Sequence, residues 1–379
     1  MDGFSQHLSD DDPPPGGVSA PEELNKTAGQ YAGQYAGQHL GQHQSSRPLS
    51  SQRAAKTSFA TALQTTVSFV IATFSKEIQQ QQLYYHNLDH VEGVAERALL
   101  IFDTVLPFAM AEVNAEIDWD RQRGLLYLCA IAHDMRQIFS PQTEPHAPRT
   151  RQKGQSELVT VQHLVNFIQQ HNPAAVASLS QTDDPMSRFT AADIRFITEA
   201  IEATICQYDP TDGAIYQPAL YPSDSRHSGQ ANNKSVKELS ISARCLALAD
   251  IGTLGISGIE AYRHEGRLLL IEENLDILAF LQDRSAFDAS YCESLRQRLL
   301  RRAKFEVMFA KGRLARLERE LQGFPEGAIA PLKNNIFKHL TPATIQAIEK
   351  ITPTQADTTL ETLIDYFQLT STVERRPRL

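Results

Sequence analysis

The sequence predicts an all-α protein. Apolar residues recur at three- and four-residue spacing along much of the chain, which is the spacing of one face of a helix. The first such run contains Phe59, Leu63, Val67, Val70, Ile71 and Phe74. Gly and Pro separate the runs, and no segment is convincing as a half-buried strand. We therefore expect antiparallel helices joined by loops.

The chain divides into three regions by composition. Residues 1–56 include the four-residue echo GQYAGQYAGQHLGQH over 29–43. Such Gly- and Gln-rich sequence has little apolar surface to bury, so it cannot offset the entropy lost on ordering. We expect a disordered low-complexity tail over 1–56, a helical domain over 57–322 and a short C-terminal helical extension over 323–379.

The next two helices can be placed from their ends. Asn87 is a good N-cap for a helix that begins at Leu88, and Pro107 is expected to end that helix. The following helix is expected to start near Asp118 and to reach the pair His133–Asp134.

The rest of the chain continues the helical pattern with two irregular stretches. Residues 139–153 hold three prolines and read as a loop, and a long loop beside a candidate site is frequently functional. A polar insert follows at 208–234. Further helices are expected over 155–170, 191–206, 236–251, 268–282, 289–321, 340–350 and 360–367.

Charge and cysteine usage restrict the class of protein. The formal net charge is −9 and no Lys/Arg run stands out, which argues against nucleic acid as an obligate partner. The four cysteines are far apart and form no C-x-x-C pair, as expected for reduced thiols in a cytosolic protein. The chain opens without a signal peptide, and its most apolar span is too short and polar to cross a bilayer. We expect a soluble cytoplasmic protein without a membrane partner.

Two imidazoles and two carboxylates stand out by type and placement. His90, His133, Asp134 and Asp250 each lie near the end of a helix whose other face is apolar. Taken singly, each reads as a capped or hydrogen-bonded residue at a helix end. Taken together, they match the ligands that a borderline divalent cation prefers, with positions left for water.

These residues also carry a resemblance. The segment YHNLDHVEGV (85–94), the pair His133–Asp134 and the late LAD (248–250) occur in the order H…HD…D. This order resembles the HD-domain superfamily of metal-dependent phosphohydrolases. The first segment resembles the Y-H-N-x-x-H signature of the class I cyclic-nucleotide phosphodiesterases. The likeness spans about 57–315.

The resemblance implies an HD-type helical bundle and a hydrolase. It implies His90, His133, Asp134 and Asp250 as metal ligands, with Asp134 bridging to a second ion if one binds. It implies His86 as the acid that protonates the leaving oxygen after attack by metal-bound hydroxide. The alternative for His86 is a helix-entry residue bonded to backbone. The expected cofactor is a divalent ion of Zn, Mn, Fe, Mg or Ni. One ion is expected, and the sequence leaves open whether a second one binds.

The chain departs from the family pattern at two positions. Gln137 stands where phosphodiesterases carry a His, and it is a poor metal ligand that can instead orient a water. FEVMF (305–309) resembles the Q-x-x-F pattern that holds the purine, but Glu306 replaces the Gln. A carboxylate accepts and cannot donate, so Glu306 and Phe309 suit cyclic AMP or cyclic GMP less well than an amide would.

Basic residues in the 139–153 loop are candidates for binding phosphate. Arg149, Arg151 and Lys153 can clamp phosphate oxygens, or they can be solvated charges on a mobile loop. The expected function is hydrolysis of a phosphomonoester or phosphodiester, with a small phosphorylated molecule such as a nucleotide as the partner. The alternative is a catalytically weak HD-fold module that binds metal and nucleotide and regulates a partner.

Overall fold

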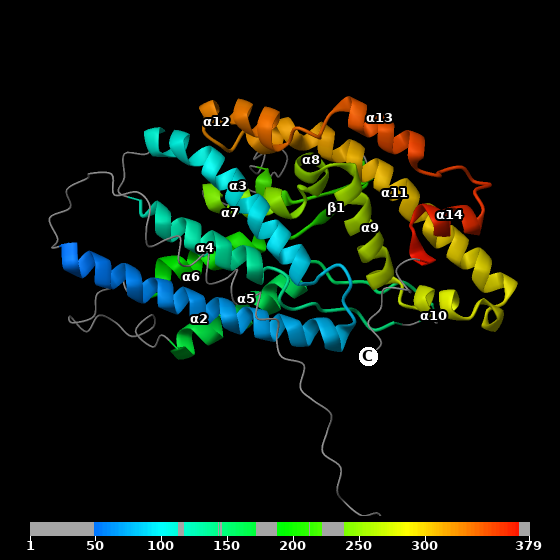
Figure 1. Ribbon diagram of the computed structural model, residues 1–379, viewed down its shortest axis with the longest axis horizontal. Helices are drawn as coiled ribbons and strands as arrows, with labels where there is room; N and C mark the ends of the chain where they lie inside the picture. Colours follow the sequence, from blue (N-terminus) through cyan, green and yellow to red (C-terminus); the bar gives the residue numbers. More distant parts are fainter. Residues whose placement is uncertain are drawn as a thin grey trace, which may run out of the picture. The chain divides into compact units, whose positions relative to one another are not determined.

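Helices make up most of the structure, as the sequence predicts (Figure 1). The structure, a computed structural model, describes residues 49–112, 117–142, 144, 146–171, 188–211, 213–221 and 239–370. All of these residues belong to one unit of the chain, Ser46–Leu379. The predicted tail over 1–56 therefore lies largely outside the described residues, although helix α2 already begins within it at Leu49.

Thirteen α-helices lie within the described residues, and the longest stretches between them separate α4 from α5, α5 from α6 and α6 from α7. The first six are α2 (Leu49–Gln81), α3 (Leu88–Glu112), α4 (Trp119–Ala132), α5 (Gln155–His171), α6 (Ala191–Glu202) and α7 (Ile241–Asp250). The later ones are α8 (Thr253–Ser257), α9 (Ile259–Glu273), α10 (Asp276–Gln282), α11 (Ala289–Leu321), α12 (Glu326–Pro331), α13 (Pro342–Ile351) and α14 (Leu360–Tyr366). Single turns of tighter or wider helix are η3 (Pro218–Leu220), η4 (Arg284–Ala286) and η5 (Leu332–Ile336).

Side-chain caps fix the starts of α3 and α4. Oδ1 of Asn87 accepts a hydrogen bond of 2.9 Å from the backbone N–H of His90, and Asp118 accepts one from Arg121. Both helices thus begin where the sequence predicts. Helix α3 does not end at Pro107, however, but continues to Glu112. Val105 and Ala109 on either side of the proline are buried, and this packing compensates for the hydrogen bond that proline cannot donate.

The predicted polar insert contains a small hairpin that the sequence pattern does not indicate. Strands β1 (Gln207–Asp209) and β2 (Ala214–Tyr216) pair antiparallel, with Tyr208 opposite Ile215. Three-residue strands are too short to show an alternating pattern. The hairpin packs against α11 through β2.

The larger apolar core is built around α3. This helix packs against α4 and α7, while α2 and α6 pack on α4 from other sides (Figure 1). Phe74 of α2, Phe102 of α3 and Leu126 of α4 are almost fully buried. Their burial shows that these three helices pack closely. The packing brings the N-terminal end of α3 together with the C-terminal ends of α4 and α7, where the predicted ligands lie.

A second apolar core joins α9, α10, α11 and α14. Leu363 and Ile364 of α14 are buried in it beside residues such as Leu295 and Leu299 of α11. The core therefore includes residues from both sides of the predicted boundary at 322–323, and that boundary stays a prediction.

Two general expectations concern thiols and membranes. The four cysteines are free, as the absence of paired spacing predicts. Within the part of the chain that the structure describes, none of the helices combines the length and the apolar character that a membrane span requires.

Candidate metal centre

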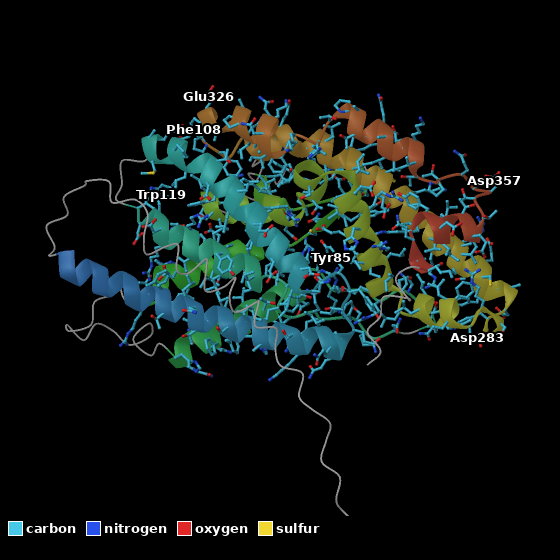
Figure 2. All side chains as sticks on the ribbon, in the orientation of Figure 1. Tyr85, Phe108, Trp119, Asp283, Glu326 and Asp357 are labelled. Atoms are coloured by element: carbon cyan, nitrogen blue, oxygen red, sulfur yellow. The ribbon has the colours of Figure 1, made fainter. Side chains whose placement is uncertain are left out.

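Three helices deliver the four predicted ligands to one place. His90 lies in the first turn of α3, His133 is the C-cap of α4 with Asp134 next to it, and Asp250 is the last residue of α7. Donor atoms of His90, His133 and Asp250 all lie within 4.8 Å of one another. Both imidazoles are buried, with His90 5% and His133 1% exposed. Figure 2 labels Tyr85 beside this end of α3.

Both carboxylates face both imidazoles. Oδ2 of Asp134 lies 3.3 Å from Nε2 of His90 and 3.1 Å from Nε2 of His133. Oδ1 of Asp250 lies 3.7 Å and 3.5 Å from the same two nitrogens. Donor atoms of His90, His133 and Asp250 therefore converge from three helices, and Oδ2 of Asp134 lies beside both imidazoles.

The two Nε2 atoms are close to these oxygens without forming hydrogen bonds to them. Neither Nε2 of His90 nor Nε2 of His133 has a hydrogen-bond partner, although both atoms are buried. Nδ1 of His133 lies 2.8 Å from the carbonyl oxygen of Ala130, to which it donates in the neutral ring. That bond places the lone pair of His133 on Nε2, toward the carboxylates.

Burial and charge act in opposite directions at this cluster. Burial alone would lower the pKa of His90 and His133, but the carboxylates of Asp134 and Asp250 outweigh it and raise both. Burial alone would raise the pKa of Asp134 and Asp250, but the imidazoles hold both below their ordinary value, Asp250 to about 2. Negative charge is thus maintained where a cation would be stabilised.

The donor set fits one divalent cation. Ligand distances for His and Asp are about 2.0–2.2 Å, so donors on opposite sides of an ion are about 4 Å apart. The contacts of 3.1–3.7 Å and the 4.8 Å limit agree with such an arrangement. Buried nitrogens that face carboxylates without hydrogen bonding are what a shared ion would leave behind.

Comparison of the chain with protein-family models, curated proteins and solved structures found nothing similar in any of the three. The chemistry of the site is therefore argued from its own residues and from the motifs they form.

His86 lies at the edge of the cluster and is held by a glutamate. Its Nδ1 is 2.5 Å from Oε1 of Glu272, while Nε2 lies 3.9 Å from Oδ2 of Asp134. The backbone N–H groups of Tyr84, Tyr85 and His86 all donate to Oε2 of the same glutamate at 3.0–3.1 Å. Glu272 thus fixes both the backbone and the ring that the Y-H-N motif supplies.

Arg151 and Gln137 complete this edge. Nη1 of Arg151 lies 2.7 Å from Nε2 of His86 and donates to Oε1 of Gln137, also at 2.7 Å. Because a guanidinium only donates, Nε2 of His86 is an acceptor here and the ring is neutral. Nε2 of Gln137 donates to Oδ1 of Asp134 at 3.1 Å. That oxygen is therefore engaged by an amide, which favours one ion over two.

The other predicted substrate residues make their contacts with residues other than the four candidate ligands. The guanidinium of Arg149 lies over the Phe139 ring and donates to Gln81, and Lys153 donates to Gln207. Glu306 accepts a hydrogen bond from Tyr366, and the ring of Phe309 stacks with that of Tyr262. None of these contacts involves a candidate ligand, so the substrate roles of these residues stay predictions.

Three further residues lie at the site: Tyr85, which belongs to the Y-H-N-x-x-H segment, and two that the sequence argument did not include, Gln217 and Glu272. The ring centroid of Tyr85 lies 4.7 Å from that of His86 and 4.3 Å from that of His90. Gln217, which is fully buried, donates to Oδ2 of Asp250 at 2.9 Å. Glu272 had a signal, since an acidic residue after the apolar run LLLI resembles the placement of Asp250. Gln217 had no sequence signal, because its position next to Asp250 depends on the hairpin β1–β2, which the sequence pattern did not indicate.

Proposed function

We propose that this chain is a metal-dependent phosphohydrolase of the HD type that hydrolyses a phosphomonoester or phosphodiester of a nucleotide. The observation that carries the proposal is the pair of unpartnered Nε2 atoms, on His90 and His133, that face Asp134 and Asp250. A buried group of this kind favours a divalent cation as the missing partner. The resemblance of 85–94 and of the HD pair to phosphohydrolases supplies the reaction.

The residues around the ion have separate tasks in this proposal. A divalent ion, when bound, lowers the pKa of a water molecule from about 15.7 to roughly 7–9 and offsets charge on phosphoryl oxygens. The leaving alkoxide then requires a proton. Nε2 of His86 faces the cluster because Glu272 holds the opposite ring nitrogen, so this nitrogen is in position to deliver that proton.

Arg151 links substrate binding to the availability of this acid. In the structure its guanidinium donates to Nε2 of His86, which prevents that nitrogen from carrying a proton. A phosphate group competes strongly for a guanidinium, which it can bind through two parallel hydrogen bonds. The substrate phosphate therefore draws Arg151 away, and Nε2 of His86 then takes up a proton from solvent and delivers it to the leaving oxygen.

The test combines metal content with turnover. Protein purified without chelator is analysed for bound metal and assayed for phosphate release from aryl phosphates and a nucleotide panel. We expect bound metal and activity to be lost together in His133→Ala and in Asp134→Ala, with helicity retained. His171→Ala is the matched control, because His171 also contacts a carbonyl of its own helix but is exposed. Turnover unchanged in the two ligand variants would refute the proposal.

The alternative is a regulatory module that binds metal and nucleotide without turnover. The contact between Arg151 and His86 favours it, because an imidazole held in this way cannot act as an acid. A thermal shift with nucleotides and no phosphate release from any of them would support this alternative over an enzyme.

A further inference from the structure

The hairpin β1–β2 is fixed to the metal centre at its open end. Gln217, the residue after β2, donates a 2.9 Å hydrogen bond to Oδ2 of Asp250. On the other strand, Oε1 of Gln207 accepts a 2.5 Å hydrogen bond from Nζ of Lys153. Lys153 lies two residues after Arg151, in the loop at the edge of the cluster. Both strands of the hairpin are therefore tied to the surroundings of the candidate ligands.

Side chains of the hairpin alternate between two faces. Residues that pair across two strands point to the same face, and consecutive residues point to opposite faces. Asp209 pairs with Ala214, and Asp209 also accepts a 2.8 Å hydrogen bond from Arg316 of α11. That pair therefore marks the face toward α11. The next pair, Tyr208 with Ile215, points to the opposite face.

This opposite face is the one from which the hairpin contacts the metal centre. Gln217 continues β2 with extended backbone angles, φ −105° and ψ 107°. It is two residues beyond Ile215, so its side chain leaves the same face of the hairpin. Two residues of a strand span about 7 Å. Tyr208 and Ile215 therefore lie about that distance along the strands from the residue that holds Asp250.

Tyr208 presents an aromatic ring to solvent on this face. The residue is 57% exposed, and its side chain makes no hydrogen bond or ring contact with another described residue. Ile215, which pairs with it, is half-buried. A single exposed apolar side chain is ordinary in itself. This ring, however, is carried by a strand that is tied to the metal centre, so it is already ordered for a ligand that stacks on it.

The residues that the resemblance assigns to the purine have other partners. Glu306 is 2% exposed, and its Oε2 accepts a hydrogen bond from the hydroxyl of Tyr366. The ring of Phe309 stacks with that of Tyr262 at a centroid distance of 6.0 Å. A base bound beside the metal centre thus requires another flat apolar surface, and the exposed ring of Tyr208 offers one.

We propose that Tyr208 and Ile215 form the surface on which the flat ring of the substrate's leaving group stacks. This inference rests on the proposed hydrolase function and adds the residues that select a nucleoside ester over a simple sugar ester. The phosphate lies at the metal centre, and the base, one sugar away, lies on Tyr208. Stacking reads the face of a base and not its edges, so the site accepts different bases.

Photolabelling of the full chain locates the base without requiring turnover. The protein is irradiated with 8-azidoadenosine 5′-phosphate, and labelled peptides are identified by mass spectrometry. We expect the label within the hairpin β1–β2. Adenosine 5′-phosphate should suppress it at a concentration about tenfold or more below that of ribose 5-phosphate, which lacks only the base. Guanosine 5′-phosphate should match adenosine 5′-phosphate within about fivefold, because every base has a face to stack. Label outside the hairpin, or equal suppression by the adenosine and ribose esters, would overturn the proposal.

Variants test the ring itself through the ratio of kcat/KM for adenosine 5′-phosphate to that for ribose 5-phosphate. We expect this ratio to be about ten or more in the wild type and in Tyr208→Phe, and to fall to about three or less in Tyr208→Ala. Met110→Ala is the matched control, because Met110 is also 57% exposed but lies about 30 Å along α3 from His90. A ratio unchanged in Tyr208→Ala would refute the role of this ring. Label in the hairpin without turnover of any ester would instead refute the hydrolase and retain the nucleotide site.

Discussion

Glu272 is the residue on which the geometry of the proposed acid depends. Its two oxygens accept from three consecutive backbone N–H groups and from the ring of His86. Burial alone would raise its pKa, but the adjoining His86 ring, its hydrogen bonds to the carboxylate and the nearby Arg151 guanidinium lower it to about 2. An ionised carboxylate in this position therefore stabilises the folded state.

The pH dependence of stability tests this role of Glu272. A folded pKa of about 2 against an ordinary value of 4.5 corresponds to on the order of 3 kcal/mol. Because the folded pKa is the lower one, this stability is fully present above pH about 4.5 and is lost as the pH falls toward about 2. We expect Glu272→Gln to be less stable than the wild type above that range, with the difference shrinking across it. Urea unfolding at several pH values measures this, and a difference independent of pH would contradict it.

Replacement of His86 tests whether it acts as an acid. We expect His86→Gln to lower turnover of a nucleotide substrate by about 10²–10⁴ while bound metal is unchanged. The loss should be much smaller with p-nitrophenyl phosphate, because p-nitrophenolate leaves without needing a proton. Equal losses on both substrates, or loss of the metal, would show that His86 does not supply a proton.

At the scale of elements, Arg97 joins the helix that carries His90 to the helix that carries Asp250. It projects from α3, and its Nε donates to the carbonyl oxygen of Ala249 at 2.9 Å. The same carbonyl oxygen accepts a 3.2 Å hydrogen bond from the backbone N–H of Gly252, so Arg97 adds a charge-assisted bond at the end of α7. The position of Asp250 relative to His90 therefore depends on a side chain that touches neither.

We expect Arg97→Met to weaken metal binding by about 10–100-fold, the range typical of residues that orient ligands. Methionine retains the apolar stem but cannot bond to Ala249. Arg123→Met, at an exposed pair with Asp103, is the control. Competition with a chromophoric chelator measures the affinity. Unchanged affinity in Arg97→Met would mean that packing alone positions Asp250.

At the scale of the molecule, helix α14 forms part of the second apolar core, together with α9, α10 and α11. Leu363 is fully buried among residues of α9, α10 and α11. Removing most of such a side chain costs both the transfer free energy and a cavity. The folded state therefore includes α14.

We expect Leu363→Ala to lower the free energy of unfolding by about 2–5 kcal/mol. Glu361→Ala, which removes an exposed ion pair with Arg284, should cost about 1 kcal/mol or less. Urea unfolding followed by circular dichroism measures both. Similar small effects of the two substitutions would indicate that α14 is only loosely attached.

The helices could be predicted because periodicity and caps are local. Helix α11 has the predicted bounds, Asn87 caps α3 as its side chain indicated, and α4 begins next to Asp118 as expected. Prediction from local sequence fails where tertiary packing compensates for a missing backbone hydrogen bond, as at Pro107 in α3. It also fails where elements are too short for a period, as in the hairpin β1–β2.

The sequence by itself determined the helical class and the four residues suited to a cation, since residue type and helix ends can be read along the chain. Only the tertiary structure decided that His90, His133 and Asp250 come within 4.8 Å of one another. It alone showed that Glu272 and Arg151 hold His86 and that Glu306 lines a pocket with residues of α9 and the end of α14. The physical reason is that an apolar stripe specifies which face of a helix is buried. Which other helix covers that face depends on side-chain packing among residues far apart in the chain.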